Sequence, residues 1–382
     1  MDRVYLDHAS AAPWHPAALA THAAVATELS ADPSRRHQEG RAASDLLEQA
    51  RGAVAAGLGA SADRLIFTSS GTESIHLAVQ GAVLANRTRR PRIVSAAVEH
   101  SAVLAAADAS GCEHVLVPVG PDGAVDLGAL AEALTGGALL VNLQHANHEV
   151  GTVQPIAEAA RLCDGADTLL HVDTCQTAGR LPVDVGALGA DFCSCSAAKF
   201  GGARGVGVLA WSPRARFRAL LVGDERERRH RSGLENLPGI AATAETLLHL
   251  APLDPSGAAA RHAERCDALR LWLRQALPAA AEDVEVHGAA EPAAPHIVAA
   301  SALYVDGEAL VAELDSAGFA VHSGSSCATT SGEPSHVLVA MGALTHGHVR
   351  VSLGGDQGPA QLERFVDAYA TAVRKLRARA AS

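Results

Sequence analysis

Lys199 is the residue of this chain whose surroundings most favour Schiff-base chemistry. It ends the run DFCSCSAAK at 191–199, where a strand-like apolar stretch gives way to small residues. Three other segments, SSGTES at 69–74, VEHSAV at 98–103 and HVDTCQTAG at 171–179, add polar residues. Together they supply what a pyridoxal phosphate (PLP) site needs: a lysine that forms an imine, a carboxylate for the pyridine nitrogen, and donors for the phosphate.

Each of these segments also fits an ordinary structural role when it is taken alone. In SSGTES a strand gives way to a helix, whose first N–H groups would hold a phosphate together with the Thr72 hydroxyl. The same residues also fit a helix N-cap. Asp173 ends its strand, where its carboxylate could keep a pyridine nitrogen protonated or cap the following turn. His100 could stack on a flat cofactor ring or be an ordinary histidine.

Cys327 lies in a segment at 320–337 that is rich in Ser, Gly and Thr. Little apolar anchoring predicts a mobile loop there. A thiol on such a loop would be exposed enough to react as a thiolate, whereas the other six cysteines lie in apolar or helical contexts. Cys193 and Cys195 alternate on one strand face and fit buried thiols. An incidental loop cysteine would explain the same segment.

Arg350 lies within the strand-like run HVRVSLG at 348–354. An arginine is unfavourable in such a run unless it meets an anion. Its guanidinium fork matches the carboxylate of an amino-acid substrate. A salt bridge to an aspartate or glutamate of the chain would satisfy it too, so both interpretations stay open.

The elements that must position these residues follow an α/β pattern. From about residue 44 to 375, short apolar runs alternate with helical patterns, which predicts βαβ units and a mostly parallel sheet. Ligands of such sheets bind outside the carboxyl ends of the strands. A rise in Pro and Gly at 250–260 predicts a domain boundary. The runs expected as strands of the large sheet are RLIFTSS, RIVSAAVE, HVLVPV, ALLVNLQH, TLLHVD, DFCSCS and GVGVLAW.

Composition limits the classes of function. The chain has 382 residues and a formal charge of −11, which argues against nucleic acid as its main ligand. Only RERRHR at 226–231 is strongly basic, and it fits either a solvated loop or a contact to a partner or phosphate. The N-terminus lacks a signal-peptide pattern and no apolar stretch could span a membrane, so we expect a cytosolic protein. The spacing of the seven cysteines predicts reduced thiols and no metal site.

The order of these motifs resembles the cysteine desulfurases of the class V aminotransferase family, over nearly the whole chain. The resemblance implies an α/β fold of the fold-type-I PLP enzymes, with a large PLP-binding domain over 14–250. A smaller α/β domain would comprise 1–13 and 251–382 and carry Cys327. The motifs that carry the resemblance are VYLDHASAAP, RLIFTSSGTES, VEHSAVL, NHEVGTVQPI, HVDTCQTAGRLPVDV, KFGGARGVG, RSGLENLPGI, SGSSCATTSGEPSHVLVAMG and VRVSLG.

The resemblance also implies roles for single residues. Lys199 would bind PLP as an imine, Asp173 would pair with the pyridine nitrogen, and His100 would stack on the ring and serve catalysis. Arg350 would hold the substrate carboxylate. Cys327 would attack the sulfur of cofactor-bound cysteine, leaving alanine and an enzyme persulfide, as in the long-loop desulfurases that serve iron–sulfur assembly and tRNA thiolation. The further cofactor contacts would be Gln176 and His148 near the phenolic oxygen, and Gly71, Thr72 and Ser196 at the phosphate.

Several positions depart from the family pattern. The usual NNE becomes Asn147-His148-Glu149, where a neutral imidazole can still donate a hydrogen bond but has a different reach. Ala198 stands where the family has a histidine before the lysine, and Leu234 replaces a threonine that reaches the neighbouring subunit's phosphate. Asp32 replaces a neutral residue beside the region that binds the substrate, and its charge would repel a carboxylate unless something pairs with it.

Three hypotheses follow. The first is a homodimeric PLP-dependent cysteine desulfurase that converts L-cysteine to L-alanine and passes the Cys327 persulfide sulfur to an acceptor protein. The second keeps PLP and Lys199 but cleaves a C–S or C–N bond of a modified amino acid without a thiol nucleophile. The third is a non-catalytic scaffold or partner of a desulfurase.

Overall fold

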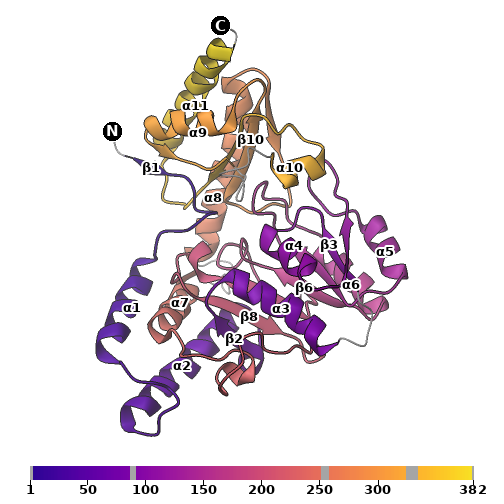
Figure 1. Cartoon of the computed structure of the whole chain (residues 1–382). Helices are drawn as coiled ribbons and strands as arrows, with labels where there is room; N and C mark the ends of the chain where they lie inside the picture. Colours follow the sequence, from indigo (N-terminus) through magenta and orange to yellow (C-terminus); the bar gives the residue numbers. More distant parts are fainter. Residues whose placement is uncertain (1–2, 87–91, 251–257, 324–333, 381–382) are drawn as a thin grey trace.

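One mixed sheet of seven strands forms the centre of the larger part of the chain (Figure 1). The computed structural model describes residues 3–86, 92–250, 258–323 and 334–380. The strand order is β2-β8-β7-β6-β5-β3-β4, and only β8 runs antiparallel to its neighbours. Each of the seven expected strands is present, which confirms the predicted fold class. Their bounds are β2 Leu65–Thr68, β3 Arg92–Ala96, β4 Glu113–Val117, β5 Leu140–Gln144, β6 Leu169–Asp173, β7 Phe192–Ser196 and β8 Gly207–Trp211.

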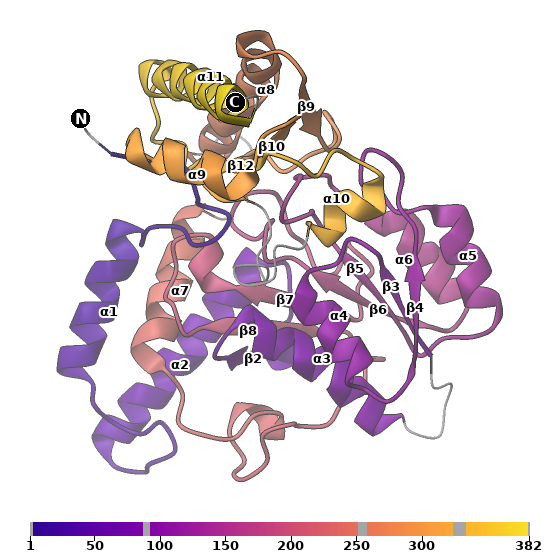
Figure 2. The same cartoon turned by 45° about the horizontal axis from the view of Figure 1, so that its top comes forward.

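Helices cover both faces of this sheet, because side chains alternate along each buried strand. In β2, Leu65 and Phe67 pack with α2 and α7, whereas Ile66 packs with α3 and α4 on the opposite face. The helices α5 and α6 cover the β3, β5 and β6 part of the sheet (Figure 2). The helix bounds are α1 Pro16–Glu28, α2 Gln38–Gly57, α3 Gly71–Ala85, α4 Ser101–Asp108, α5 Leu127–Thr135, α6 Ile156–Gly165 and α7 Leu237–Leu250.

A second hydrophobic core lies in the C-terminal part of the chain, and the first residues of the chain join it. Val4 and Leu6 pack in this core, and β1 pairs with β11 in parallel. The three-stranded sheet here has the order β12-β10-β9. The element bounds are β1 Val4–Tyr5, α8 Ala258–Ala280, β9 Val284–His287, β10 Ile297–Ala302, α9 Gly307–Ser316, β11 Phe319–Ala320, α10 His336–Met341, β12 His348–Ser352 and α11 Pro359–Ala380.

The helix α11 packs in this second core, and one other helix joins the two parts of the chain. The apolar face expected for α11 is buried, including Leu362, Phe365 and Tyr369. However, α10 contributes Val337 and Leu338 to the core of the large sheet, so the two parts share a packed boundary. Residues 251–257, where we expect the domain boundary, lie outside the described residues, and the boundary stays a prediction.

The longest described helices, α8 and α11, have 23 and 22 residues. Both carry many charged side chains. Among the residues described, no helix joins the length and apolar character needed to cross a lipid bilayer.

The basic run at 226–231 is tied to the large sheet by a buried ion pair. Arg51 of α2 donates two hydrogen bonds of 2.8 Å to the Glu227 carboxylate, which also accepts one of 2.7 Å from the Phe67 N–H. Residues 227–229 all have positive φ, of 42°, 56° and 67°. A left-handed conformation is unfavourable by about 1–2 kcal/mol for each non-glycine residue. The Arg51–Glu227 ion pair therefore stabilises a strained turn.

The arginines of the same run are matched by carboxylates. Arg228 contacts Glu48, and Arg229 contacts Glu225. Arg231 donates a hydrogen bond of 3.1 Å to Glu73 in the first turn of α3. The run is therefore an ion-paired loop that braces the start of α3.

We predict that Glu227→Gln destabilises the protein by about 3–5 kcal/mol, because it leaves the buried Arg51 guanidinium without its counter-charge. The matched control is Glu113→Gln, which breaks a pair between Arg92 and the 59% exposed Glu113 side chain. That change should cost less than about 1 kcal/mol. Urea denaturation of both variants measures the difference, and equal losses would contradict the role given to Glu227.

Candidate active site

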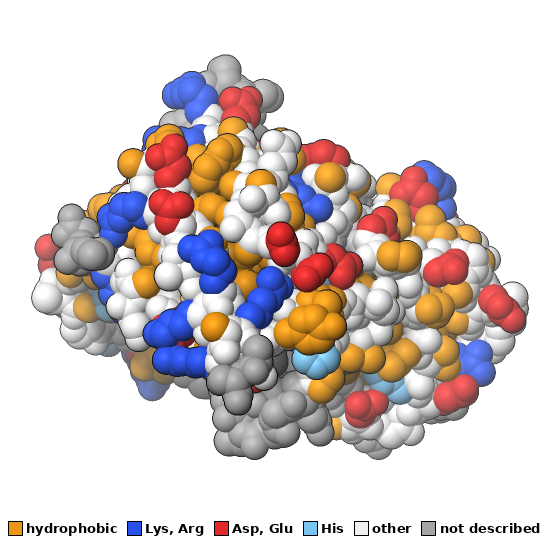
Figure 3. All heavy atoms as spheres, turned by 90° about the horizontal axis from the view of Figure 1, so that it is seen from above, with side chains coloured by type: hydrophobic (Ala, Val, Ile, Leu, Met, Phe, Trp, Pro, Cys, Tyr) orange, Lys and Arg blue, Asp and Glu red, His pale blue; other side chains and the backbone are white. Residues whose placement is uncertain are grey.

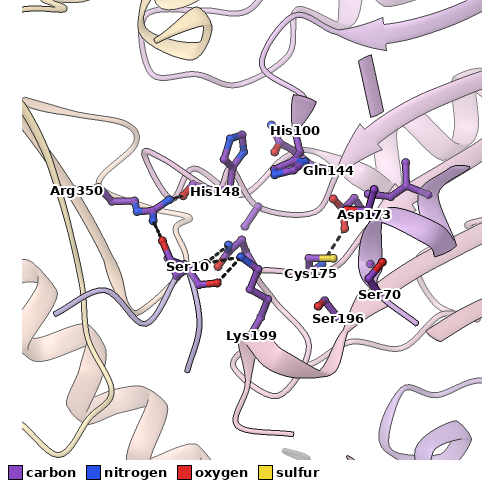
Figure 4. A pocket seen from close by; sticks show the side chains of 16 residues that line it. Ser10, Ser70, His100, Gln144, His148, Asp173, Cys175, Ser196, Lys199 and Arg350 are labelled. Atoms are coloured by element: carbon purple, nitrogen blue, oxygen red, sulfur yellow. Dashed lines mark hydrogen bonds between the residues drawn. The ribbon is translucent and has the colours of Figure 1, made fainter. Parts of the chain in front are cut away.

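The polar ends of several strands meet around one cavity of about 190 Å³ (Figure 4). Gln144 ends β5 and Asp173 ends β6, and these two residues are register partners. Lys199 follows β7 through one short helical turn, η2 Ala197–Lys199. The cavity thus lies at the carboxyl edge of the sheet, as expected for this fold. The residues that line it are Ala9, Ser10, Ser70, Gly71, Thr72, Ile75, His100, Gln144, Ala146, His148, Asp173, Cys175, Gln176, Ser196, Lys199 and Arg350.

The Lys199 amine is held by backbone oxygens of the N-terminal segment. Its Nζ donates hydrogen bonds of 2.8 Å to the carbonyls of Ala9 and Ser10. Burial lowers the pKa of Lys199, since the charged ammonium loses hydration. A lowered pKa increases the fraction of neutral amine, which is the form that attacks a carbonyl.

Asp173 ends β6, the strand that pairs with β7, and Gln176 follows in the next turn. The Asp173 carboxylate accepts a 3.0 Å hydrogen bond from the Cys175 N–H and one of 3.3 Å from the Ser194 hydroxyl. Asp173 thus stabilises the following turn, one of the two roles considered for it, and it also lines the cavity. Gln176 donates to the Ala9 carbonyl at 3.0 Å, and its side-chain oxygen lies 3.3 Å from His296 Nε2.

The start of α3 faces the cavity at the end opposite Arg350, as Figure 4 shows for Ser70 and Ser196. The Ser70 hydroxyl accepts a hydrogen bond from the Glu73 N–H, so the capping interpretation is correct for this serine. Gly71 has no room for a side chain, because an added Cβ would lie 2.8 Å from Cys175 Sγ and 3.0 Å from Ser196 Cβ. Gly71 and Thr72, the first two residues of the helix, line the cavity, and the start of a helix favours binding of an anion.

Two histidines line the cavity across from Lys199. His100 is the N-cap of α4, and its Nδ1 accepts a 3.1 Å hydrogen bond from the Ala102 N–H. The ring centres of His100 and His148 are 5.0 Å apart in an edge-to-face arrangement. Burial lowers the pKa of both rings, with the shift of His148 the larger. Both imidazoles are therefore neutral near pH 7.

Arg350 forms an ion pair within the chain, which is one of the two roles that its sequence context left open, and it also lines the cavity. Its Nη2 lies 3.0 Å from the Asp7 carboxylate and donates a 2.7 Å hydrogen bond to the Ser10 hydroxyl. Its Nη1 donates to the His148 carbonyl at 2.9 Å. The buried Nε has no hydrogen-bond partner among the residues described. The guanidinium is thus fixed by the chain and still borders the cavity.

Nearly all the expected site residues that the structure describes border this one cavity. The exception is Asp32, which forms hydrogen bonds of 2.7 and 2.8 Å with Arg226 and lies outside the cavity lining. Its charge therefore has a partner, which removes the repulsion expected for an unpaired acid. Cys327 lies outside the described residues.

The sequence analysis missed four lining residues whose side chains carry a polar group or a thiol: Ser10, Ser70, Gln144 and Cys175. Our expectation that all cysteines other than Cys327 lie in apolar or helical contexts is wrong for Cys175. This residue lies between Asp173 and Gln176 in a turn after β6, a position that its spacing could have indicated. Cys193 and Cys195 are buried as expected.

The donor set fits PLP. A lysine amine of lowered pKa, an aspartate carboxylate and a glutamine amide border the middle of the cavity, and the open start of α3 lies at one end. Two further buried groups at the cavity, the His148 ring and Arg350 Nε, have no hydrogen-bond partner in the described part of the chain. Such groups are expected where a polar ligand binds. Lys199, Asp173, His100, Gly71, Thr72 and Ser196 would hold the cofactor.

Comparisons with known proteins agree with this geometry. The Aminotransferase class-V family profile matches residues 4–365. A cysteine desulfurase IscS from Dictyoglomus turgidum is 34% identical over 98% of this chain and 95% of its own length. Another from an Anaeromyxobacter species (strain Fw109-5) is 39% identical over 90% of this chain and 85% of its own. A solved NifS-like protein aligns with a TM-score of 0.89 at 28% identity, covering 98% of this chain and all of that one.

The chain therefore belongs to the class V aminotransferases, a family of PLP-dependent enzymes. Within that family it is a member of the cysteine desulfurase group of the IscS and NifS type.

We predict that Gly71→Ala weakens PLP binding by roughly tenfold, about 1.4 kcal/mol, because the new methyl group pushes the helix start away from Cys175 and Ser196. The control is Gly52→Ala in α2, where an added Cβ meets nothing within 4 Å. Titration of each apoprotein with PLP, followed by absorbance, measures the affinity. Equal affinities for the two variants would contradict the assigned phosphate end.

Proposed function

We propose that this protein is a PLP-dependent cysteine desulfurase, which converts L-cysteine to L-alanine and collects the sulfur as a persulfide on Cys327. The observation that carries this proposal is the position of the Lys199 amine, between the start of α3 and the Arg350 guanidinium (Figure 4). One end can thus hold a phosphate and the other the carboxylate of an amino acid. The relatives named as cysteine desulfurases support the choice of substrate.

Each side chain of the site has a separate task. PLP, when bound, withdraws electrons from the substrate and so eases bond breaking at its α- and β-carbons. Asp173 would hold a proton at the pyridine nitrogen, which strengthens that effect. The neutral amine of Lys199 would hold the cofactor, and Arg350 would attract and orient the substrate carboxylate.

The overall reaction balances without an added oxidant. The C–S bond of cysteine breaks, an S–S bond to Cys327 forms, and the substrate carbon gains a proton. Two thiol hydrogens are consumed, while one C–H of alanine and one S–H of the persulfide are formed. The carbon is reduced as the transferred sulfur is oxidised, so a thiol nucleophile is sufficient.

We also propose that the active form is a homodimer that delivers sulfur to an acceptor protein. Large apolar side chains are exposed beside the 226–231 loop: Val222 is 81% exposed and Leu234 is 63% exposed. Exposed apolar residues that cluster on one segment favour a protein contact there.

The test supplies L-cysteine to the PLP-loaded protein and measures alanine together with the mass of the Cys327 peptide. We expect stoichiometric alanine and a 327 peptide heavier by one sulfur. Cys327→Ser should lower alanine formation by on the order of 10³-fold or more, as expected for loss of a nucleophile. Cys112→Ser, a partly buried thiol outside the cavity lining, should leave the rate unchanged.

Two outcomes would contradict this proposal. Absence of alanine from protein that has bound PLP at Lys199 would exclude desulfuration of cysteine. Turnover that persists in Cys327→Ser would favour the alternative, a lyase that cleaves a C–S or C–N bond without a thiol nucleophile.

A further inference from the structure

His148 is a buried histidine whose ring nitrogens form no hydrogen bond within the described part of the chain. Its ring lines the cavity, and the residue is 5% exposed. Neither Nδ1 nor Nε2 has a hydrogen-bond partner among the described residues. Its neighbours are other imidazoles, with ring centres 5.0 Å away at His100 and 6.3 Å away at His336.

An unsatisfied buried imidazole is unfavourable, because both ring nitrogens lose hydrogen bonds to water. Other buried histidines of this sheet do not show this. His171 lies 2.9 Å from Asn142 Oδ1 through Nδ1 and 3.0 Å from Ser194 Oγ through Nε2. Both ring nitrogens of His148 are therefore available to a molecule in the cavity, and Figure 4 shows the ring across from Lys199.

The carboxyl group of Glu149 lies close to the His148 ring. Glu149 Oε1 is 3.7 Å from His148 Nε2, slightly beyond hydrogen-bond length, and the Glu149 side chain is 1% exposed. The Ser335 hydroxyl donates a hydrogen bond to the other oxygen, Oε2. Burial raises the pKa of Glu149 to about 7. The carboxyl group can thus hold or release a proton near neutral pH.

We propose that His148 and Glu149 form a proton relay that supplies the proton taken up by the substrate carbon when it loses sulfur. This inference rests on the proposed desulfurase function. The neutral ring takes a proton from Glu149 at Nε2 and gives one from its other nitrogen. The thiol hydrogen released when the S–S bond forms enters the ring at Nδ1, and Nε2 returns its proton to the Glu149 carboxylate, so the proton count and the ring tautomer are both restored within one turnover.

The surroundings favour a relay through a neutral ring. Burial, with the charges of Arg350 on β12 and Lys199 after β7 and the rings of His100 and His336, keeps the pKa of His148 well below its ordinary value. A resting imidazolium is therefore excluded at neutral pH. Meanwhile the 2.9 Å hydrogen bond from Arg350 Nη1 to the His148 carbonyl fixes the backbone beside the ring.

Variants of the relay test its catalytic part. We expect His148→Asn, which keeps a hydrogen-bonding amide, and His148→Ala to lose 10²–10⁴-fold in alanine formation while retaining PLP, the range typical of general acid–base groups. Added imidazole should restore activity at least tenfold to His148→Ala and leave His148→Asn unchanged.

Because the relay needs protonated Glu149, the wild-type rate should fall as pH rises through about 7, and Glu149→Gln should lose this pH dependence.

A second readout needs neither cofactor nor turnover. In the apoprotein, His148→Phe should raise the melting temperature, because it removes unsatisfied buried nitrogens. The matched control His171→Phe should lower it, because it leaves the Asn142 and Ser194 side chains without their partner. A lower melting temperature for His148→Phe, as for the control, would show that His148 is satisfied and would overturn the inference.

The two proposals fail in different ways. Absence of alanine from wild-type protein would refute the desulfurase function. Wild-type alanine formation together with an unimpaired His148→Asn, or with a His148→Ala that imidazole does not restore, would refute the relay alone.

Discussion

Burial of the Lys199 amine against two backbone carbonyls is the interaction on which the rest of the site depends. The acceptors, Ala9 and Ser10, belong to a segment that begins in the C-terminal core, where Val4 and Leu6 are packed. The same segment accepts a hydrogen bond from Gln176, and its Ala12 N–H donates to the Ala198 carbonyl at 2.9 Å. The start of the chain thus joins the second core to the strand ends of the large sheet, and this junction forms the cavity.

This junction bears on two departures from the family pattern, at Ala198 and His148. Ala198 contributes its backbone carbonyl to the junction, a role that any side chain at this position allows. Meanwhile His148 places an imidazole across the cavity, at a position where the family resemblance implies asparagine. The proposed relay would place an acid–base group on this opposite wall, next to the buried Glu149. This chain would then differ from its relatives in the position of its proton-carrying side chain, while the fold stays the same.

Much of the fold and many of the site residues could be predicted from the sequence. The strands were predictable because buried parallel strands are continuous apolar runs, and Thr72 and Asp173 because polar side chains follow those runs. The places of Gln176, His148 and Ser196 came from the family resemblance. The contacts of Ala9 and Ser10 could not be predicted, since backbone carbonyls leave no side-chain signal. The pairing of Asp32 with Arg226 joins residues 194 positions apart and depends on the strained turn held by Glu227. The ion pair of Arg350 with Asp7 also needed the structure, because the two residues are 343 positions apart in the sequence.

The most direct test of this account is chemical trapping of the lysine. The chain has only two lysines, Lys199 in the cavity and Lys375 on the surface of α11, paired with Glu313. Protein incubated with PLP is reduced with borohydride, digested, and analysed by mass spectrometry. The account predicts one cofactor per chain on the Lys199 peptide and none on the Lys375 peptide. A label that is absent, or that divides between the two lysines, would contradict it.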